Sequence, residues 1–160
     1  MRRPLHPARR PAAAGLLLAL LAAAGCSAST GAQGGGSGLF RSELGNAPSA
    51  ALLAQIAGAS LQSFGFEVRL ATEDVLETEW RVREPSPEQR GLGVLEVRDQ
   101  ARVLVRSRGS SFVVGDLRVA TEGRSPEGWV ALAPSSGAVD EYASIVTQVR
   151  ERLSRYMTQN

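Results

Sequence analysis

Glu77 and Glu79 are the residues whose type and spacing best suit acid/base chemistry in this chain. They are two positions apart in an alternating segment, so on a strand both carboxylates point to one side, about 7 Å apart. Such a pair could hydrolyse a glycan if a cleft desolvated one of the two groups. Arg81 and Arg83 follow at the same spacing, and nearby positive charge keeps carboxylates ionised. We therefore expect a solvated, ion-paired sheet face, with a small carboxylate-dependent cell-wall glycan hydrolase as the alternative.

Other residues that could act as nucleophiles or metal ligands are scarce. The chain has one histidine, His6, and one cysteine, Cys26. If residues 1–25 are removed and Cys26 is modified, no Ser-His-Asp or Cys-His site and no His/Cys metal site can form in the rest of the chain. We expect a protein that is not an enzyme and that holds no metal and no cofactor.

The N-terminal segment has the three parts of an export signal. An apolar run over residues 15–24 ends in small residues just before Cys26, and it is preceded by four arginines, Arg2, Arg3, Arg9 and Arg10. This order is typical of a secretory signal peptide, and the run is shorter than the roughly 20 apolar residues that span a bilayer. With a cysteine at the cut point, the segment resembles a bacterial lipoprotein signal, which implies cleavage after Gly25 and acylation of Cys26. The alternative is a plain secretory signal that ends near a cysteine.

The lipoprotein resemblance also implies a location. Ser27, rather than an aspartate, follows the cysteine, which implies anchoring in the outer membrane with the domain facing the periplasm, or in the cell membrane if the organism has only one. Removal of the four signal arginines changes the formal net charge from +2 to −2 (2 − 4), and this excludes a strongly basic nucleic-acid-binding domain. The expected partners are the membrane, through acylated Cys26, and a protein of the envelope; the oligomeric state is left open.

Composition divides the remaining chain into two parts. Residues 26–45 begin with a run rich in glycine and serine, which predicts a lipidated, flexible tether. Residues 46–158 are long enough for one small domain. The sequence therefore predicts a single domain held close to a membrane.

Hydrophobic periodicity predicts the elements of that domain. Asn46 should cap a helix that ends at Gly65, and alternating residues predict strands near 66–70, 75–84 and 113–121. Residues 93–106 fit one long, bent strand better than a hairpin turning at Asp99-Gln100. A loop over 123–137 then leads to an amphipathic helix over 138–157. We expect an α+β fold: helix, antiparallel meander of three to four strands, and C-terminal helix, in a two-layer helix-grip-like sandwich.

Two tryptophans and one set of arginines are the remaining candidates for binding. Trp80 has the phase of a core residue, whereas Trp129 stands in a loop without periodic partners. Trp129 either covers the edge of the core or, if exposed, contacts a partner, because tryptophan is enriched at interface hot spots. The residues Arg98, Arg102 and Arg106 share one strand face, where pairing with Glu77 and Glu79 is favoured over a basic stripe.

Two stretches of the sequence resemble a known envelope protein. They are Leu61-Gln62-Ser63-Phe64-Gly65-Phe66-Glu67-Val68 and Leu76-Glu77-Thr78-Glu79-Trp80. A helix ending in a Gly-Phe step before an alternating strand, with an aromatic residue on the next strand, resembles the repeated domain of the BamC-type lipoprotein of the outer-membrane β-barrel assembly machine. The resemblance covers residues 47–121 and implies a helix-grip fold and a non-catalytic, partner-binding accessory role in outer-membrane assembly.

Overall fold

A computed structural model describes residues 38–159 of the chain. In this part the elements follow in the order β1 (Leu39–Ala47), α1 (Ala50–Ser63), β2 (Val68–Ala71), β3 (Val75–Thr78), β4 (Arg81–Arg83), α2 (Pro87–Gly91), β5 (Glu96–Arg108), β6 (Phe112–Ser125), β7 (Gly128–Ala131) and α3 (Ser136–Gln159). The expected α+β class with an antiparallel sheet and a long C-terminal helix is confirmed.

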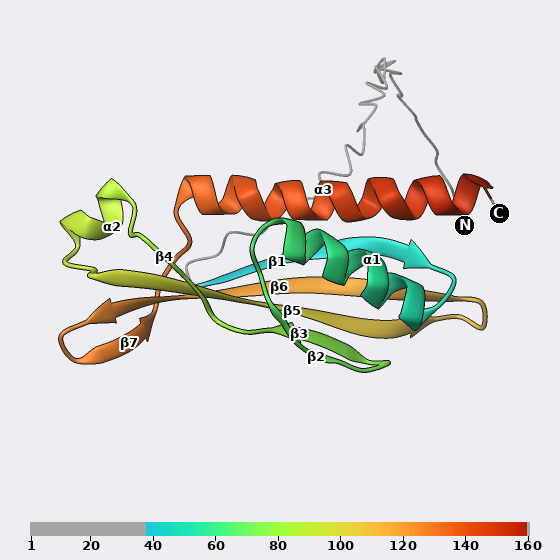
Figure 1. Cartoon of the computed structure of the whole chain (residues 1–160), viewed down its shortest axis with the longest axis horizontal. Coiled ribbons are helices and arrows are strands. Elements are labelled where there is room, and N and C mark those ends of the chain that lie inside the picture. The colour runs from blue at the N-terminus through green and yellow to red at the C-terminus, as the bar shows by residue number, and fades with distance from the viewer. Residues whose placement is uncertain (1–37, 160) are drawn as a thin grey trace, which may run out of the picture.

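The long hairpin of β5 and β6 is the centre of a seven-stranded antiparallel sheet. On one side of the hairpin, β1 and β7 pair with successive stretches of β6. On the other side, β3 and β4 pair with successive stretches of β5, and β2 extends the sheet beyond β3. Helices α1 and α3 lie on the same face of this sheet (Figure 1). The opposite face is not covered by any element of residues 38–159, and we call it the open face.

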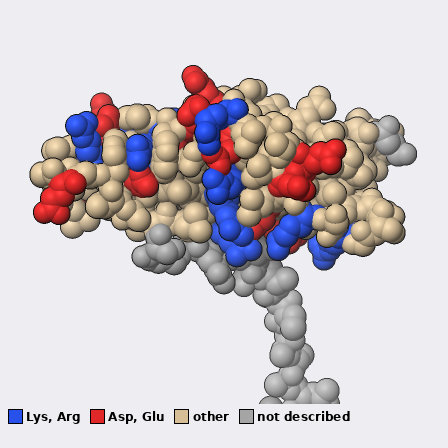
Figure 2. Space-filling model, turned by 90° about the horizontal axis from the view of Figure 1, so that it is seen from below, with Lys and Arg blue, Asp and Glu red and all other residues tan. Residues whose placement is uncertain are grey.

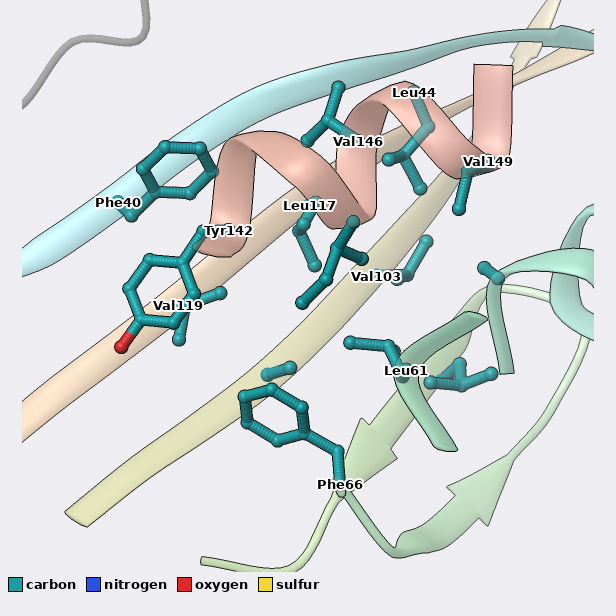
Figure 3. Packing of buried hydrophobic residues seen from close by; sticks show 14 of the residues in the cluster. Phe40, Leu44, Leu61, Phe66, Val103, Leu117, Val119, Tyr142, Val146 and Val149 are labelled. Carbon is teal, nitrogen blue, oxygen red and sulfur yellow. The ribbon is translucent and has the colours of Figure 1, made fainter. Parts of the chain in front are cut away.

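The hydrophobic core fills the space between the sheet and the two helices. Tyr142, Val146 and Val149 of α3 belong to this core together with Leu117 and Val119 of β6, and the ring of Tyr142 lies beside Val119 (Figure 3). The apolar stripe predicted for the last helix is confirmed at its buried positions. Only its last member differs, because Tyr156 is 40% exposed where α3 extends past the core. Hydrophobic periodicity alone was sufficient to predict the buried side of α3, because a helix that packs on a sheet must bury one continuous apolar stripe.

The prediction of a flexible tether up to residue 45 is wrong for residues 39–45. They form most of β1, which pairs with β6 and buries Phe40 and Leu44 in the core. Phe40 meets Tyr142 edge-on, with ring centroids 5.3 Å apart. Burial of these two side chains stabilises an ordered strand where glycine-rich composition predicted none. Residues 26–37 of the proposed tether, including Cys26, lie outside the described residues.

The prediction for the start of α1 is wrong, and the prediction for its end is correct. Asn46 does not cap the helix, because it is still part of β1. Ser49 is the cap instead, and its side chain accepts a hydrogen bond from the Leu52 amide at 3.2 Å. Gly65 does follow the helix, with a φ of +79°, a backbone conformation that favours glycine. The polar stretch after residue 84 contains the short helix α2, which begins with a capping box of Ser86 and Gln89.

The predicted long strand after residue 93 is confirmed as β5, without a turn at Asp99-Gln100. Asp99 keeps the alternation of its neighbours and points to the helix-covered face, where it is fully buried. The loop predicted for residues 123–137 is wrong in its first part. The end of β6 and all of β7 occupy residues 123–131 and carry Trp129 into the sheet.

Candidate functional site

A one-residue slip between β3 and β4 decides which side chains reach the open face. Glu77 of β3 is opposite Arg102, whereas Arg81 of β4 is opposite Asp99. A continuous strand would have placed residue 80 opposite Asp99 instead. Since side chains alternate along a strand, a slip of one position exchanges the two faces. The predicted single strand over 75–84 is therefore wrong, and so is its predicted assignment of faces.

The slip turns two arginines inward beneath the helices. Arg83 donates from Nε to Asp99 Oδ2 at 2.7 Å, and Arg81 Nη2 lies 3.4 Å from the same oxygen. The hydroxyl of Thr121 donates to Asp99 Oδ1 at 2.9 Å. Arg81 also reaches Glu141 of α3, at 2.5 Å. Because a buried carboxylate without partners is very costly, these contacts explain why β4 turns its arginines towards Asp99.

Tyr142 belongs to the same buried polar cluster. Its hydroxyl lies 3.4 Å from that of Thr121. Burial, and secondarily the charge of Asp99, raise the pKa of Tyr142 well above the ordinary value of 10.0. The phenol of Tyr142 therefore stays neutral. The contacts of Glu141 and Tyr142 with this cluster hold the first turns of α3 against the sheet. Asp99, Thr121 and Tyr142 at the centre of the cluster are buried, so we assign the cluster to stability rather than to binding.

The same slip places Trp80 on the open face, contrary to the prediction that it packs in the core. Its ring lies against Arg98 of β5, whose Cζ atom is 4.4 Å from the ring centroid. The ring of Trp129 contacts the same guanidinium, with its centroid 4.1 Å from Cζ. Glu122 fixes the cation from β6, accepting from Arg98 Nε at 2.8 Å and from Nη2 at 2.6 Å. We call Trp80, Arg98 and Trp129 the tryptophan–arginine stack.

Strand β7 is what brings Trp129 into the stack. Gly128, with a φ of +126°, begins the strand, and Trp129 is then opposite Arg124 of β6. The interpretation of Trp129 as a cover for the core edge is wrong, because the ring lies on the open face. Both tryptophans are half-buried. An arginine over an aromatic face gains about 0.5–2 kcal/mol from each such contact, so the stack is held in place before any partner arrives.

A hollow adjoins the stack at the same end of the sheet. It measures about 540 Å³ and is lined by Val82, Leu95 and Arg124, among others. Val82 is opposite Arg98 in the sheet and is 56% exposed, and Leu95 is 67% exposed. Large apolar side chains with this exposure, next to two half-exposed tryptophans, form an amphipathic contact surface.

The predicted ion-paired face is confirmed for Glu77 and Glu79, which lie beside arginines, and wrong for Arg81 and Arg83, which point to the helix-covered face. Arg102 binds Glu77 as expected, from Nε to Oε2 at 2.7 Å. Arg98 pairs with Glu122 instead, and Arg106 has no charged partner among residues 38–159.

The two carboxylates considered for catalysis lie in different surroundings. Glu77 is buried beneath Arg69 and Arg102, whereas Glu79 is exposed, 3.8 Å from Arg69 Nε. Both carboxylates therefore form ion pairs with guanidinium groups, and only one of the two is open to solvent.

The sequence predicted Trp129 as a possible contact residue, but it placed Trp80 in the core and paired Arg98 with Glu77 and Glu79, because the stack depends on the β3–β4 slip. No helix within residues 38–159 has the length and apolar character to cross a membrane. No family model matches the sequence, and no curated protein resembles it closely enough to be identified as a relative.

Proposed function

We propose that this protein is a non-catalytic, lipid-anchored lipoprotein of the bacterial envelope whose open sheet face binds a protein partner. The observation that carries the proposal is the tryptophan–arginine stack, 4.1–4.4 Å between the guanidinium and each ring centroid. Tryptophan and arginine are the residue types most enriched at binding hot spots. The signal segment that ends at Cys26 supports membrane anchoring. An accessory role in outer-membrane assembly fits this arrangement.

Preorganisation supports the choice of site. Ordering a mobile side chain on binding makes the binding free energy less favourable by about 0.5–1.5 kcal/mol. Arg98 is already fixed by Glu122 and by the two rings, so a partner meets an ordered surface. The adjoining hollow between Val82 and Leu95 can receive an apolar side chain of that partner. The other face of the sheet offers no comparable surface, because α1 and α3 cover it.

Photo-crosslinking in intact cells tests the proposal. A benzophenone amino acid at Val82, beside the stack, should give a discrete adduct with one envelope protein. The same group at Thr147, exposed on α3, should not give that adduct and serves as the matched control. Replacement of Trp129 by alanine should weaken partner binding by about 2 kcal/mol or more, about thirtyfold in affinity, while the melting temperature stays within a few degrees. Equal adducts at both positions would refute docking on the open face.

The anchor has a separate test. The Cys26→Ser protein should leave the membrane fraction, and mass spectrometry of the wild type should show a mature chain that begins with an acylated Cys26. An unmodified cysteine in membrane-isolated protein would contradict the lipoprotein assignment, whatever the crosslinks show.

A further inference from the structure

Four arginines form a row across the middle of the open face. Arg102 of β5 and Arg118 of β6 are directly opposite each other, and Arg41 of β1 is opposite Arg118. Arg69 reaches the row from β2 through its contact with Glu77. With strands about 4.8 Å apart, the row spans the four gaps from β2 to β1, about 19 Å. A band of basic and acidic side chains crosses the short dimension of this face in Figure 2. We call these residues the arginine row.

Two carboxylates lie beneath the row, and each is shared by two arginines. Glu77 accepts from Arg69 and Arg102, and Asp116 accepts from Arg41 and Arg118. The side chains of Glu77 and Asp116 are only 6% and 4% exposed, whereas those of the four arginines are 36–51% exposed. A molecule that approaches the face therefore meets guanidinium groups above these two acids, with the exposed Glu79 beside Arg69 at one end of the row. Four cations and three anions leave this part of the surface at +1 (4 − 3).

The row is not arranged for stability alone. Like charges directly opposite each other on neighbouring strands are unfavourable, and Arg102 and Arg118 stand in that relation. The positive charge of each of these two arginines is only half neutralised, because its carboxylate partner also binds a second arginine. An anion placed over the gap between β5 and β6 would satisfy the outward N–H groups of both. Arginine forks suit carboxylates because they donate two parallel hydrogen bonds.

We infer that the arginine row recognises an acidic segment of the protein partner. This inference rests on the proposed function and specifies the chemistry of the partner. An extended segment of about six residues has the length of the row, since a strand rises about 3.3 Å per residue. The tryptophan–arginine stack lies four residues along β5, about 13 Å away. A partner whose acidic segment is flanked by apolar side chains fits both features of the same face, and this favours a protein over a phosphate-bearing ligand.

The mature, acylated protein in neutral detergent can be tested with a defined probe, a fluorescein-labelled peptide of six glutamates. Anisotropy should detect binding that weakens as salt is raised, and a peptide of six glutamines should not bind. The double variant Arg102→Gln/Arg118→Gln should bind hexaglutamate at least tenfold more weakly. The matched control, Arg152→Gln/Arg155→Gln on α3, removes the same charge from another surface and should change the affinity less than twofold.

The contrary outcomes are equally specific. Equal losses in the two double variants would show a mere effect of net charge and overturn the inference. Displacement of hexaglutamate by inorganic phosphate at equal concentrations of charge would assign the row to a phosphate-bearing ligand and also overturn it. If the Arg102→Gln/Arg118→Gln variant does not fold, Arg102→Lys/Arg118→Lys keeps the positive charge but lacks the two parallel N–H donors of a guanidinium. This variant should bind hexaglutamate at least threefold more weakly than the wild type, and an unchanged affinity would overturn the inference.

The two proposals fail separately. A Val82 adduct with no effect of the arginine pair on hexaglutamate would reject the acidic segment alone. Binding that depends on the arginine pair, without a Val82 adduct, would support recognition of acidic groups and reject docking at the stack.

Discussion

Replacement of Phe40 by alanine tests whether β1 is an integral part of the domain. Phe40 is fully buried, lies opposite Val119 on β6 and packs edge-on against Tyr142. Truncation of a buried phenylalanine to alanine costs about 3–5 kcal/mol, including the cavity that it leaves. A domain of this size is stable by about 5–15 kcal/mol, so the change removes a large part of the total. At about 4 °C per kcal/mol, the melting temperature should fall by about 12–20 °C.

The assay is thermal and urea unfolding of the acyl-free mature chain, followed by circular dichroism. Leu39→Ala is the matched control, because Leu39 is opposite Ala120 on the open face and its loss should cost less than about 1 kcal/mol. A chain that begins at Asn46 lacks most of β1 and should not unfold cooperatively. A Phe40→Ala protein that melts within about 3 °C of the wild type would refute the reasoning. Cooperative unfolding of the shortened chain would refute it as well.

Three further outcomes follow from individual side chains. Asp99→Asn should destabilise the fold by about 3–5 kcal/mol, because Arg81 and Arg83 lose their buried counter-ion. The control Asp140→Asn, at an exposed position of α3, should cost less than about 0.5 kcal/mol. Similar losses for the two variants in urea unfolding would contradict a stabilising role for the buried polar cluster. Tyr142 has a raised pKa, so its unfolded form ionises first. Stability should fall as the pH rises above about 10, by up to about 1.4 kcal/mol per pH unit more than in Tyr142→Phe, and parallel pH profiles of the two proteins would rule this out. Glu79→Gln removes one of the two carboxylates that a glycan hydrolase would need, yet it should change neither the melting temperature nor the Val82 adduct; loss of cellular function by this folded variant would favour the hydrolase.

The sequence by itself determined the elements whose signal is local. The stripe from Tyr142 to Leu153 required a helix that packs on one face, and Gly65 marked the end of α1, since both signals depend only on residues a few positions apart. The alternation along residues 93–106 likewise predicted β5 as one strand. A weaker local signal also existed in β1, where Phe40, Ser42 and Leu44 alternate with the charged residues Arg41 and Glu43. The glycine-rich composition before this segment hid that signal.

Only the tertiary structure decided which face each side chain occupies. The pattern from Leu76 to Val82 predicts one strand with Trp80 in the core, and nothing within those residues indicates a slip. The slip follows from Asp99, which is distant in sequence and, once buried, needs Arg81 and Arg83 beside it. The resulting exchange of faces brings Trp80 to Arg98, and the pairing of β7 with β6 brings Trp129 to the same cation. Periodicity is a property of neighbouring residues, whereas the compensation of a buried charge depends on the whole fold, so the site could be recognised only in three dimensions.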